Sequence, residues 1–354
     1  MNIDECVWDL LDSLRVLPWV NTDPSGEGEV TNREIEMKKT TKSLATTLVA
    51  AVLAFAAGAA SATYTSLTVF GDSLSDGGNV FTLTGGAFPP PPYAQRFTNG
   101  PTAVEHLAGA LGLPLTPSLS GGSNHAFGGA ETGTGSFIGL PSTGVSSQVS
   151  SFVSSPPSGF GGPSGLVVLW AGPNDMFTAL DLGMNPADVI APAMGNLANS
   201  VGQLYGVGAR TILMPGMPNM GATPFGLNSG NAAGLTAFSL GFNGALALTV
   251  AGLEASFLGL DIIESSTFTL LDGVVANPGA FGFTNVQDAC FDGASVCANP
   301  DEYLFWDSVH PTARGHEILG ASFATAVPEP NSIALIAGAL VVFGAARRRT
   351  AVRS

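Results

Sequence analysis

Basic residues are scarce and unevenly placed in this sequence of 354 residues. Lysine and arginine together number 12, against 27 aspartates and glutamates, and the net charge is −15. Between residues 63 and 327 the basic residues are Arg96, Arg210 and Arg314, there is no lysine, and 17 acidic residues bring the charge of this part to about −14. Such a charge gives no long-range attraction to nucleic acid or to anionic lipid. We therefore expect no nucleic-acid partner.

Two further patterns are missing. The chain has no internal repeat at a fixed period, which argues against repeat architectures. It also lacks the G-x-S-x-G motif, which counts against an ordinary α/β-hydrolase.

The first 62 residues divide into two parts of different composition. Residues 1–36 hold nine acidic and two basic residues without a persistent hydrophobic period, and we interpret them as a disordered gene-model extension ahead of a start at Met37. A basic stretch at 37–42, an apolar run at 44–59 and small residues at 60–62 then follow in the order of a secretory signal peptide. A membrane anchor or a buried helix at 44–59 is the alternative.

The last 27 residues, 328–354, also have three parts. A Pro-Glu-Pro motif at 328–330 precedes an apolar run at 333–346, and arginines close the chain. This order resembles the PEP-CTERM sorting signal of Gram-negative bacteria, which an exosortase recognises and which anchors the chain transiently by a transmembrane helix. A plain C-terminal anchor is the alternative. The two ends together predict export across the inner membrane, with signal peptidase and exosortase as processing partners, to the medium, the cell surface or the extracellular matrix.

Removing both ends leaves residues 63–327, enough for one domain with a sizeable core. Cys290 and Cys297 are its only cysteines. In an exported chain two cysteines this close predict a disulfide, whereas C-x6-C without a nearby histidine pair is a weak metal pattern. We predict that this disulfide forms and that the protein needs neither a metal nor another cofactor.

Within this domain short apolar runs alternate with helical stretches. Strands are predicted at 67–70, 166–170, 211–214 and 261–263, with a short one at 124–127. Helices are predicted at 102–111, 145–154, 186–205, 233–258 and 313–324. Short apolar strands separated by helices indicate a mostly parallel sheet covered on both faces. The fold class is therefore α/β, with about five strands in the sheet.

Two of these strands deliver polar side chains to the same edge of the sheet. The run at 67–70 ends at the motif GDSLSDGGN (71–79), which places Ser73 directly after the strand. The run at 166–170 is followed by GPND (172–175), which places Asn174 in the equivalent position. Ligands of open α/β sheets bind at this edge. Taken alone, Ser73 and Asn174 are better explained as turn residues.

Two other segments supply the remaining groups. In NHAFGGA (124–130), glycines allow backbone N–H groups to approach a substrate closely. In DSVHP (307–311), Asp307 precedes His310 by three residues, and the proline that follows keeps His310 out of a helix. Taken alone, Asp307 is better explained as a helix cap.

Other polar residues near these motifs are interpreted as structural. His106 and His316 fall on predicted helices, and His125 is expected to make a loop contact. Asp76 and Asn79 are expected to brace the turn after Ser73.

These blocks, in this order, resemble the SGNH or GDSL-type hydrolase family. The resemblance covers residues 66–326 and includes RFTNGP (96–101) and CANPDEYLFWD (297–307). It is closest to the lipase/esterase branch that contains the lecithinase- and haemolysin-like proteins. The resemblance implies a three-layer, flavodoxin-like α/β/α sandwich.

The resemblance also implies roles for individual residues. Ser73 would be the nucleophile, His310 the general base and Asp307 the carboxylate that orients it. The oxyanion donors would be the Ser73 N–H, the Gly129 N–H and the Asn174 side chain, with Gly128 as the alternative to Gly129. These residue types suit acyl transfer, because a serine hydroxyl needs an imidazole to accept its proton and the oxyanion needs fixed donors.

The sequence thus predicts a secreted serine esterase or lipase that acts through an acyl-enzyme. An acyltransferase of the same fold and a non-catalytic surface or matrix protein on this scaffold are the alternatives. The acyl chain and the alcohol stay open: phospholipid, triacylglycerol, acylated polysaccharide and small aryl esters all fit the motifs.

Overall fold

The computed structural model describes residues 64–327. The predicted extension at 1–36, the signal peptide at 37–62 and the sorting segment at 328–354 lie outside the described residues. Four parallel strands form the central sheet in the order β1-β2-β3-β4. Their bounds are Ser66–Gly71 (β1), Gly162–Trp170 (β2), Ala209–Pro215 (β3) and Asp261–Ser265 (β4).

The predicted strand at 124–127 lies beside β1 without forming a regular ladder. Val69 donates its N–H to Ser123 O at 3.0 Å and accepts the N–H of His125 at 2.7 Å. The N–H of Phe127 donates to Gly71 O at 3.1 Å, and Val69 and Asn124 form a parallel bridge. With this segment counted as the second strand, the order is the 2-1-3-4-5 of flavodoxin-like folds. The sheet therefore has four regular strands and one irregular parallel neighbour.

The alternating residues of each strand face two separate cores. In β2, Val167 and Leu169 belong to one cluster, whereas Leu166, Val168 and Trp170 belong to the other. This alternation follows from the two-residue period of a strand, and fully apolar strands are what a sheet covered on both faces requires.

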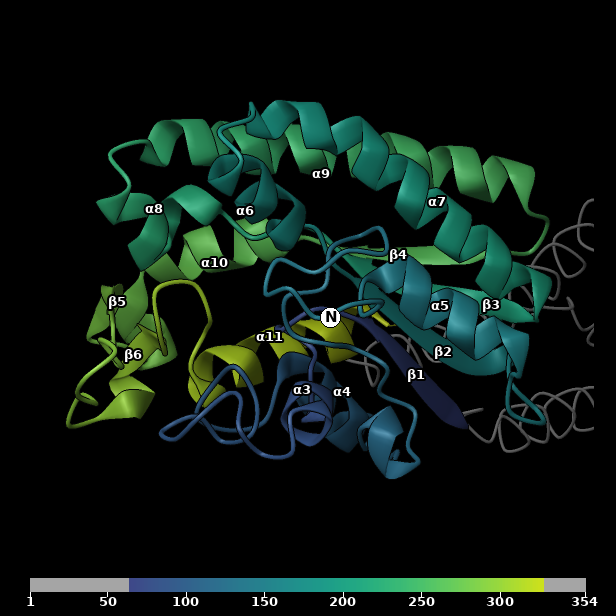
Figure 1. Ribbon diagram of the computed structural model, residues 1–354, viewed down its shortest axis with the longest axis horizontal. Helices are drawn as coiled ribbons and strands as arrows, with labels where there is room; N and C mark the ends of the chain where they lie inside the picture. The colour runs from purple at the N-terminus through teal and green to yellow at the C-terminus, as the bar shows by residue number, and fades with distance from the viewer. Residues whose placement is uncertain (1–63, 328–354) are drawn as a thin grey trace, which may run out of the picture. The chain divides into compact units, whose positions relative to one another are not determined.

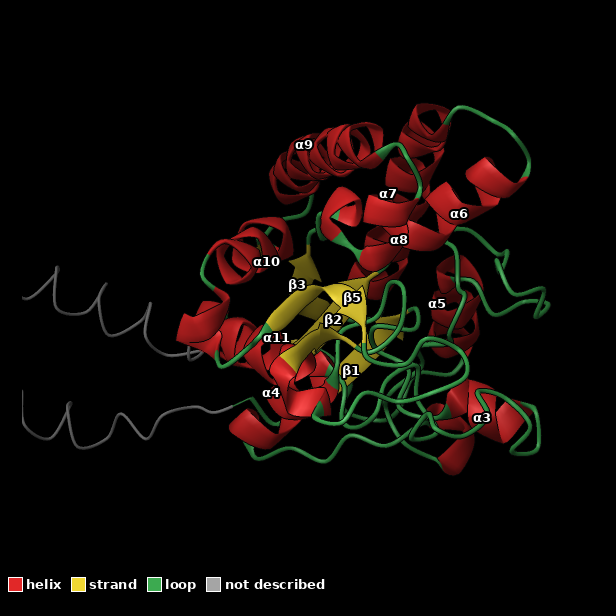
Figure 2. Cartoon of the chain, turned by 90° about the vertical axis from the view of Figure 1, so that its left-hand side faces the viewer, coloured by secondary structure: helices red, strands yellow, loops and turns green. Residues whose placement is uncertain are grey.

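Helices cover both faces of the sheet (Figure 1, Figure 2). The first face packs against α5 (Val145–Ser154), α7 (Ile190–Gly206) and α9 (Ala232–Ser256). The second packs against α4 (Ala103–Leu111) and α11 (Ala313–Ala326). This is the predicted three-layer α/β/α sandwich, and these five helices agree with the predicted stretches within a few residues. The remaining elements are α3 (Asn79–Leu83), η1 (Ser118–Ser120), α6 (Pro173–Asp181), η2 (Pro186–Val189), η3 (Met220–Ala222), α8 (Pro224–Asn228), α10 (Thr267–Ala276), η4 (Pro278–Phe281), β5 (Asn285–Ala289), η5 (Pro300–Glu302) and β6 (Tyr303–Phe305).

Helix α9 is, among the described residues, long and apolar enough to cross a membrane by length and composition. Its buried residues Leu235, Phe238, Phe242, Leu246 and Val250 recur every three or four positions and lie in the first core cluster. This spacing places them on one face of the helix, so α9 packs on the sheet as a core helix.

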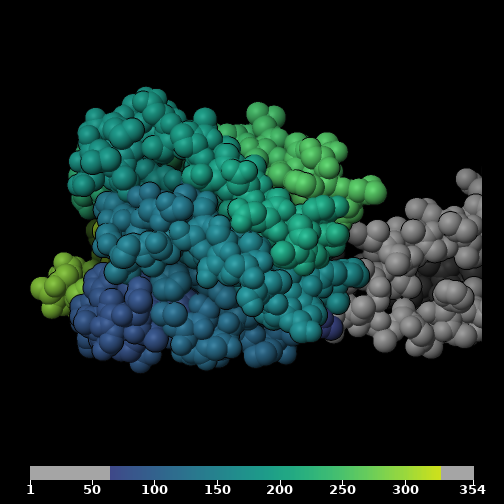
Figure 3. Space-filling view, turned by 45° about the vertical axis from the view of Figure 1, so that its right-hand side comes forward, coloured from purple at the N-terminus to yellow at the C-terminus, as the bar shows by residue number. Residues whose placement is uncertain are grey.

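A small two-stranded sheet, β5 and β6, was not predicted from the sequence. Cys290 and Cys297, next to it, form a disulfide. The N–H groups of Cys290 and Phe291 donate to Phe305 O at 3.0 Å and Trp306 O at 2.6 Å. The disulfide loop is therefore bonded to the segment that leads to Asp307. In Figure 3 this yellow-green part of the chain lies beside the dark blue N-terminal segments of the domain.

We predict that the disulfide contributes about 2–3 kcal/mol to the free energy of unfolding, because closing a short loop removes chain entropy from the unfolded state. Replacing both Cys290 and Cys297 by alanine should lower the urea midpoint with little change in slope. A reducing agent should lower the midpoint of the parent protein and leave the double variant unaffected. Equal midpoints for the parent and the variant would contradict the prediction.

Candidate active site

The turn after β1 holds Ser73 at the edge of the sheet. Gly71 is required there, because a Cβ atom at this position would overlap Trp170 O on β2. Asp72 O accepts the N–H groups of Ser75 and Asp76 at 3.0 Å each, and Asp72 Oδ1 accepts the N–H of Leu74 at 3.0 Å. The backbone carbonyl and the side chain of Asp72 thus fix the turn in which Ser73 lies.

Asp76 braces this turn against the 124–130 segment. Its buried carboxylate accepts the N–H groups of Gly78, Asn79 and Val80 at 2.7, 2.6 and 3.2 Å, and that of Gly128 at 2.9 Å. Asn79 adds to the brace, since its Nδ2 donates to Asn124 O and Ala126 O at 2.8 and 2.9 Å. The two segments that bear Ser73 and Gly129 are therefore held at a fixed separation.

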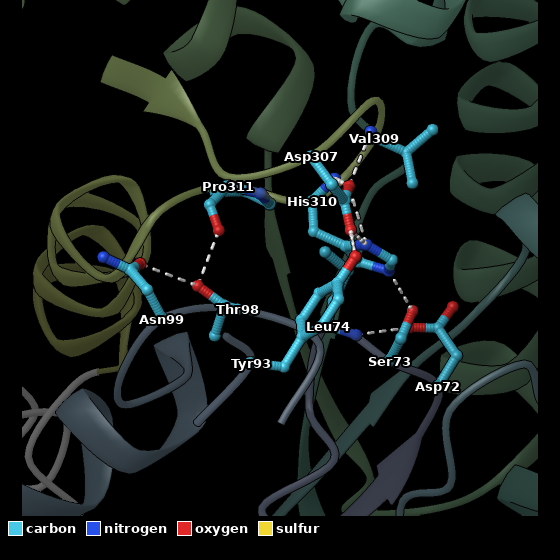
Figure 4. Close-up of polar contacts among 10 residues, drawn as sticks. All are labelled: Asp72, Ser73, Leu74, Tyr93, Thr98, Asn99, Asp307, Val309, His310 and Pro311. Atoms are coloured by element: carbon cyan, nitrogen blue, oxygen red, sulfur yellow. Dashed lines mark hydrogen bonds and ion pairs between the residues drawn. The ribbon is translucent and has the colours of Figure 1, made fainter. Parts of the chain in front are cut away.

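His310 connects Ser73 to Asp307 (Figure 4). Its Nε2 lies 2.8 Å from Ser73 Oγ, and its Nδ1 lies 2.7 Å from Asp307 Oδ2 and 3.0 Å from Oδ1. Asp307 Oδ1 also accepts the N–H groups of Val309 and His310 at 2.9 and 2.8 Å. Residues 237 positions apart in the chain thus form one continuous row of hydrogen bonds.

Tyr93 is a fourth member of this row that the sequence reasoning missed. Its hydroxyl donates to Asp307 Oδ2 at 2.8 Å (Figure 4). Its ring packs edge-on against Phe291 and Trp306. No motif marks Tyr93, which lies in the proline-rich loop after α3. Only the packing of that loop against the disulfide segment reveals its contact with Asp307.

The electrostatics of the pair favour an ionised Asp307 beside a basic His310. Burial favours the uncharged form of Asp307, but the charge and hydrogen bonds of His310 outweigh it and lower the pKa of the carboxyl. Burial likewise favours neutral His310, but the charge and hydrogen bond of Asp307 outweigh it and raise its pKa above the ordinary 6.5. An imidazole in this setting accepts a proton more readily than a free one.

Two backbone N–H groups near Ser73 are free of protein acceptors. Within residues 64–327, neither the Ser73 N–H nor the Gly129 N–H has a hydrogen-bond acceptor, whereas the Gly128 N–H is bound to Asp76. Gly129 has φ of 76°, and a Cβ there would lie 2.6 Å from Ile138 Cγ1. Of the two glycines left open by the sequence, Gly129 has the free donor.

The third donor predicted from the sequence is Asn174, which lies at the start of α6. Its Nδ2 donates to Ala130 O at 3.0 Å, which leaves the second hydrogen of the amide available. Asp175 fixes this end of the helix, because its carboxylate accepts the N–H and hydroxyl of Thr132 at 2.9 and 2.7 Å. Asn174 is thus a helical residue held against the 130–132 loop.

All five predicted side chains and donors border one cavity of about 250 Å³: Ser73, Gly129, Asn174, Asp307 and His310. The rest of its lining is largely apolar and includes Phe88, Phe97, Phe137, Phe177 and Phe305. In the part of the chain that the structure describes, no group of three or more His, Cys, Asp or Glu residues could hold a metal ion.

The other histidines lie outside this row of hydrogen bonds. The His125 ring packs against Phe70 and Phe152 at 5.2 and 5.1 Å, and burial lowers its pKa to about 4. His316 accepts the N–H of Ala103 at 3.1 Å and links α11 to α4. These contacts agree with the structural roles expected of His125 and His316.

Sequence comparison identifies relatives along most of the described chain. Residues 67–323 match the GDSL-like Lipase/Acylhydrolase family. A GDSL esterase/lipase of Arabidopsis thaliana is 27% identical, over 72% of this chain and 83% of that protein. Acetylajmalan esterase 2 of Rauvolfia serpentina is 26% identical, over 72% and 87%. Lipase 1 of Photorhabdus luminescens is 27% identical over 78% of this chain and 52% of its own length.

Structure comparison finds similar solved structures. A G-D-S-L lipolytic protein from Veillonella parvula is 14% identical and has a TM-score of 0.41. The match covers 73% of this chain and 94% of that one. An acetylxylan esterase from Geobacillus stearothermophilus is 15% identical, with a TM-score of 0.40 over 74% and 93%. The family match extends from β1 to α11 and contains every residue of the site. This chain belongs to the GDSL-like lipase/acylhydrolase family.

Proposed function

We propose that this protein is a serine esterase or lipase that hydrolyses carboxylic esters through a Ser73-His310-Asp307 triad. The observation that carries the proposal is the row of hydrogen bonds from Ser73 Oγ through His310 to Asp307, which borders an apolar cavity beside free N–H donors. The blocks GDSLSDGGN, GPND and DSVHP support the narrower assignment to the branch of lecithinase- and haemolysin-like proteins.

Acylation begins when His310 Nε2 takes the proton of Ser73 Oγ and the oxygen attacks the ester carbonyl. The carbonyl oxygen becomes an oxyanion, which the N–H groups of Ser73 and Gly129 and the amide of Asn174 stabilise. The tetrahedral species collapses as the bond to the alcohol oxygen breaks and His310 gives that oxygen the proton. The products of this half-reaction are the free alcohol and an ester of Ser73.

Deacylation repeats these steps with water as the nucleophile. His310 accepts a proton from the water, hydroxide adds to the acyl carbonyl, and the second oxyanion occupies the same donors. Collapse returns the proton to Ser73 Oγ and releases the acid. Asp307 keeps Nδ1 of His310 protonated throughout, and the Tyr93 hydroxyl keeps Asp307 in place.

We predict different kinetic signatures for the nucleophile and the oxyanion donor. Ser73→Ala should abolish turnover and labelling by a fluorophosphonate, and His310→Ala should do the same because an unassisted hydroxyl is barely nucleophilic. Asn174→Ala should keep slow labelling and lower kcat by roughly 10²–10³-fold. The double change at Ser73 and His310 should cost little more than either alone. Retention of most activity by a folded Ser73→Ala protein would contradict the proposal.

We also predict a specific change in pH dependence. Activity of the parent should fall on the acid side with an apparent pKa above 6.5, because His310 must be neutral and its pKa is raised by Asp307. In Asp307→Asn the charge is lost and burial dominates, so this limb should move below 6.5 while kcat falls by up to about 10⁴-fold. Profiles of kcat/KM against pH would show the shift. An unchanged acid limb in the variant would exclude Asp307 as the partner of His310.

We further propose that the protein is exported and trimmed at both ends. The signal-peptide pattern at 37–62 and the tripartite tail at 328–354 support this, and a disulfide is favoured by an oxidising compartment.

Mass measurement of exported material should find an N-terminus near Thr63 and no chain beyond the Pro-Glu-Pro region. Recovery of an intact arginine tail would show that the C-terminal segment is not cleaved and would favour a simple membrane anchor over a sorting signal. Recovery of residues 1–36 would contradict a start at Met37.

A further inference from the structure

The cavity beside Ser73 indicates which acyl group the site accepts. We infer that it binds the acyl chain of a medium-chain fatty ester and that an acetyl group fills it poorly. A cavity of about 250 Å³ has many times the space that one water-sized group needs, so the single methyl of an acetyl group would leave most of it unfilled. This inference rests on the proposed esterase function.

The lining of the cavity runs from the surface into the core. Phe137 and Phe88 are 45% and 39% exposed, whereas Trp170 and Phe305, which line the same cavity, are 1% and 2% exposed. Besides the proposed catalytic groups, its polar side chains are Asp72, Tyr93 and Thr223. A sugar with many hydroxyls would find few partners here, whereas an alkyl chain would be removed from water along its length.

Phe137 and Phe177 form one wall of the cavity, and their position next to the proposed oxyanion donors assigns this wall to the acyl side of the ester. Phe177 is three residues after Asn174 on α6, so both lie on one side of the helix. Phe137 packs against Phe177 at 5.5 Å between ring centroids, and its N–H donates to Gly129 O at 2.8 Å. The segments that supply two oxyanion donors therefore also supply this wall.

The alcohol of the ester lies on the other side. His310 must protonate the leaving oxygen, so the alcohol lies next to His310, whose ring centroid is 5.6 Å from that of Phe97. The chain that follows the Phe137–Phe177 wall is consequently the acyl chain.

The expected selectivity follows from the apolar area that each methylene buries. About 0.8 kcal/mol per buried methylene corresponds to a factor of about four in kcat/KM, at 1.4 kcal/mol per tenfold. Even partial burial of six added methylenes should make octanoate at least about tenfold better than acetate.

The test uses two ester series with the full-length chain. In the first, p-nitrophenyl acetate, butyrate, octanoate and palmitate vary the acyl chain. In the second, methyl, butyl and octyl acetate vary the alcohol. We expect kcat/KM to rise at least about tenfold from acetate to octanoate and to fall again at palmitate, with little change along the alcohol series.

Variants of α6 then locate the binding site. Phe177→Ala should lower the ratio of octanoate to acetate kcat/KM at least about fivefold, and Phe177→Leu should restore much of it, because leucine keeps an apolar side chain at the wall. Leu180→Ala, on the same helix but outside the cavity lining, is the matched control and should leave both activities unchanged. Thermal unfolding shows that each variant is folded.

Each outcome bears on a different claim. Turnover that requires Ser73 but is as fast with acetate as with octanoate would overturn the inference and leave the esterase proposal intact. A preference that follows the alcohol series would place the chain on the His310 side and overturn the acyl assignment. No turnover of any ester, with no fluorophosphonate labelling, would overturn the proposed function and the inference together.

Discussion

The site depends on three parallel segments that end at the same edge of the sheet. β1 pairs with β2 on one side and with residues 124–127 on the other. The connection from β1 to residues 124–127 contains α4 on one face of the sheet, and the connection from there to β2 contains α5 on the other face. A crevice forms at such a switch point, because the connections on its two sides diverge to opposite faces of the sheet. Ser73, Gly129 and Asn174 follow these three segments, so the proposed nucleophile and the proposed oxyanion donors lie at one edge because of the strand order alone.

Asp76 holds the turn after β1 and the 124–130 segment in a fixed position relative to each other. A buried carboxylate is costly unless its oxygens are hydrogen-bonded, and here four backbone N–H groups from two segments satisfy it. Because the Gly128 N–H is one of them, the next N–H along the chain, that of Gly129, stays free. Asp76 thus stabilises the turn that holds Ser73 and determines which glycine N–H can serve as the proposed oxyanion donor.

The histidine side of the site has its own support. The Trp306 N–H donates to His310 O at 2.7 Å, and the Thr98 hydroxyl donates to Pro311 O at 2.8 Å (Figure 4). With the disulfide loop bonded to Phe305 and Trp306, the DSVHP segment is held from both sides although it contains little regular structure. Such support suits a base that must stay within hydrogen-bond reach of Ser73.

The sequence by itself determined the sheet and the layers, and it predicted which polar groups lie at one edge of the sheet. Apolar runs such as residues 166–170 and 211–214, and helical stretches such as 145–154, are set by local periodicity, and motifs after the strands placed Ser73 and Asn174 at one edge. Helix α10 and the β5–β6 pair were missed, because Thr267–Ala276 is rich in β-branched residues and the two short strands are stabilised mainly by contacts outside themselves.

Only the tertiary structure decided which hydrogen bonds form between residues far apart in the sequence and which residues line the cavity. Gly128 and Gly129 are equivalent in the sequence, and they differ because one N–H reaches Asp76. Tyr93 carries no sequence signal, since its hydrogen bond to Asp307 joins positions 214 residues apart. The cavity also has no sequence signature, because its walls come from residues between Asp72 and Leu319. Hydrogen bonds and packing act over a few ångströms in space, whereas sequence patterns report only the local conformation of the chain.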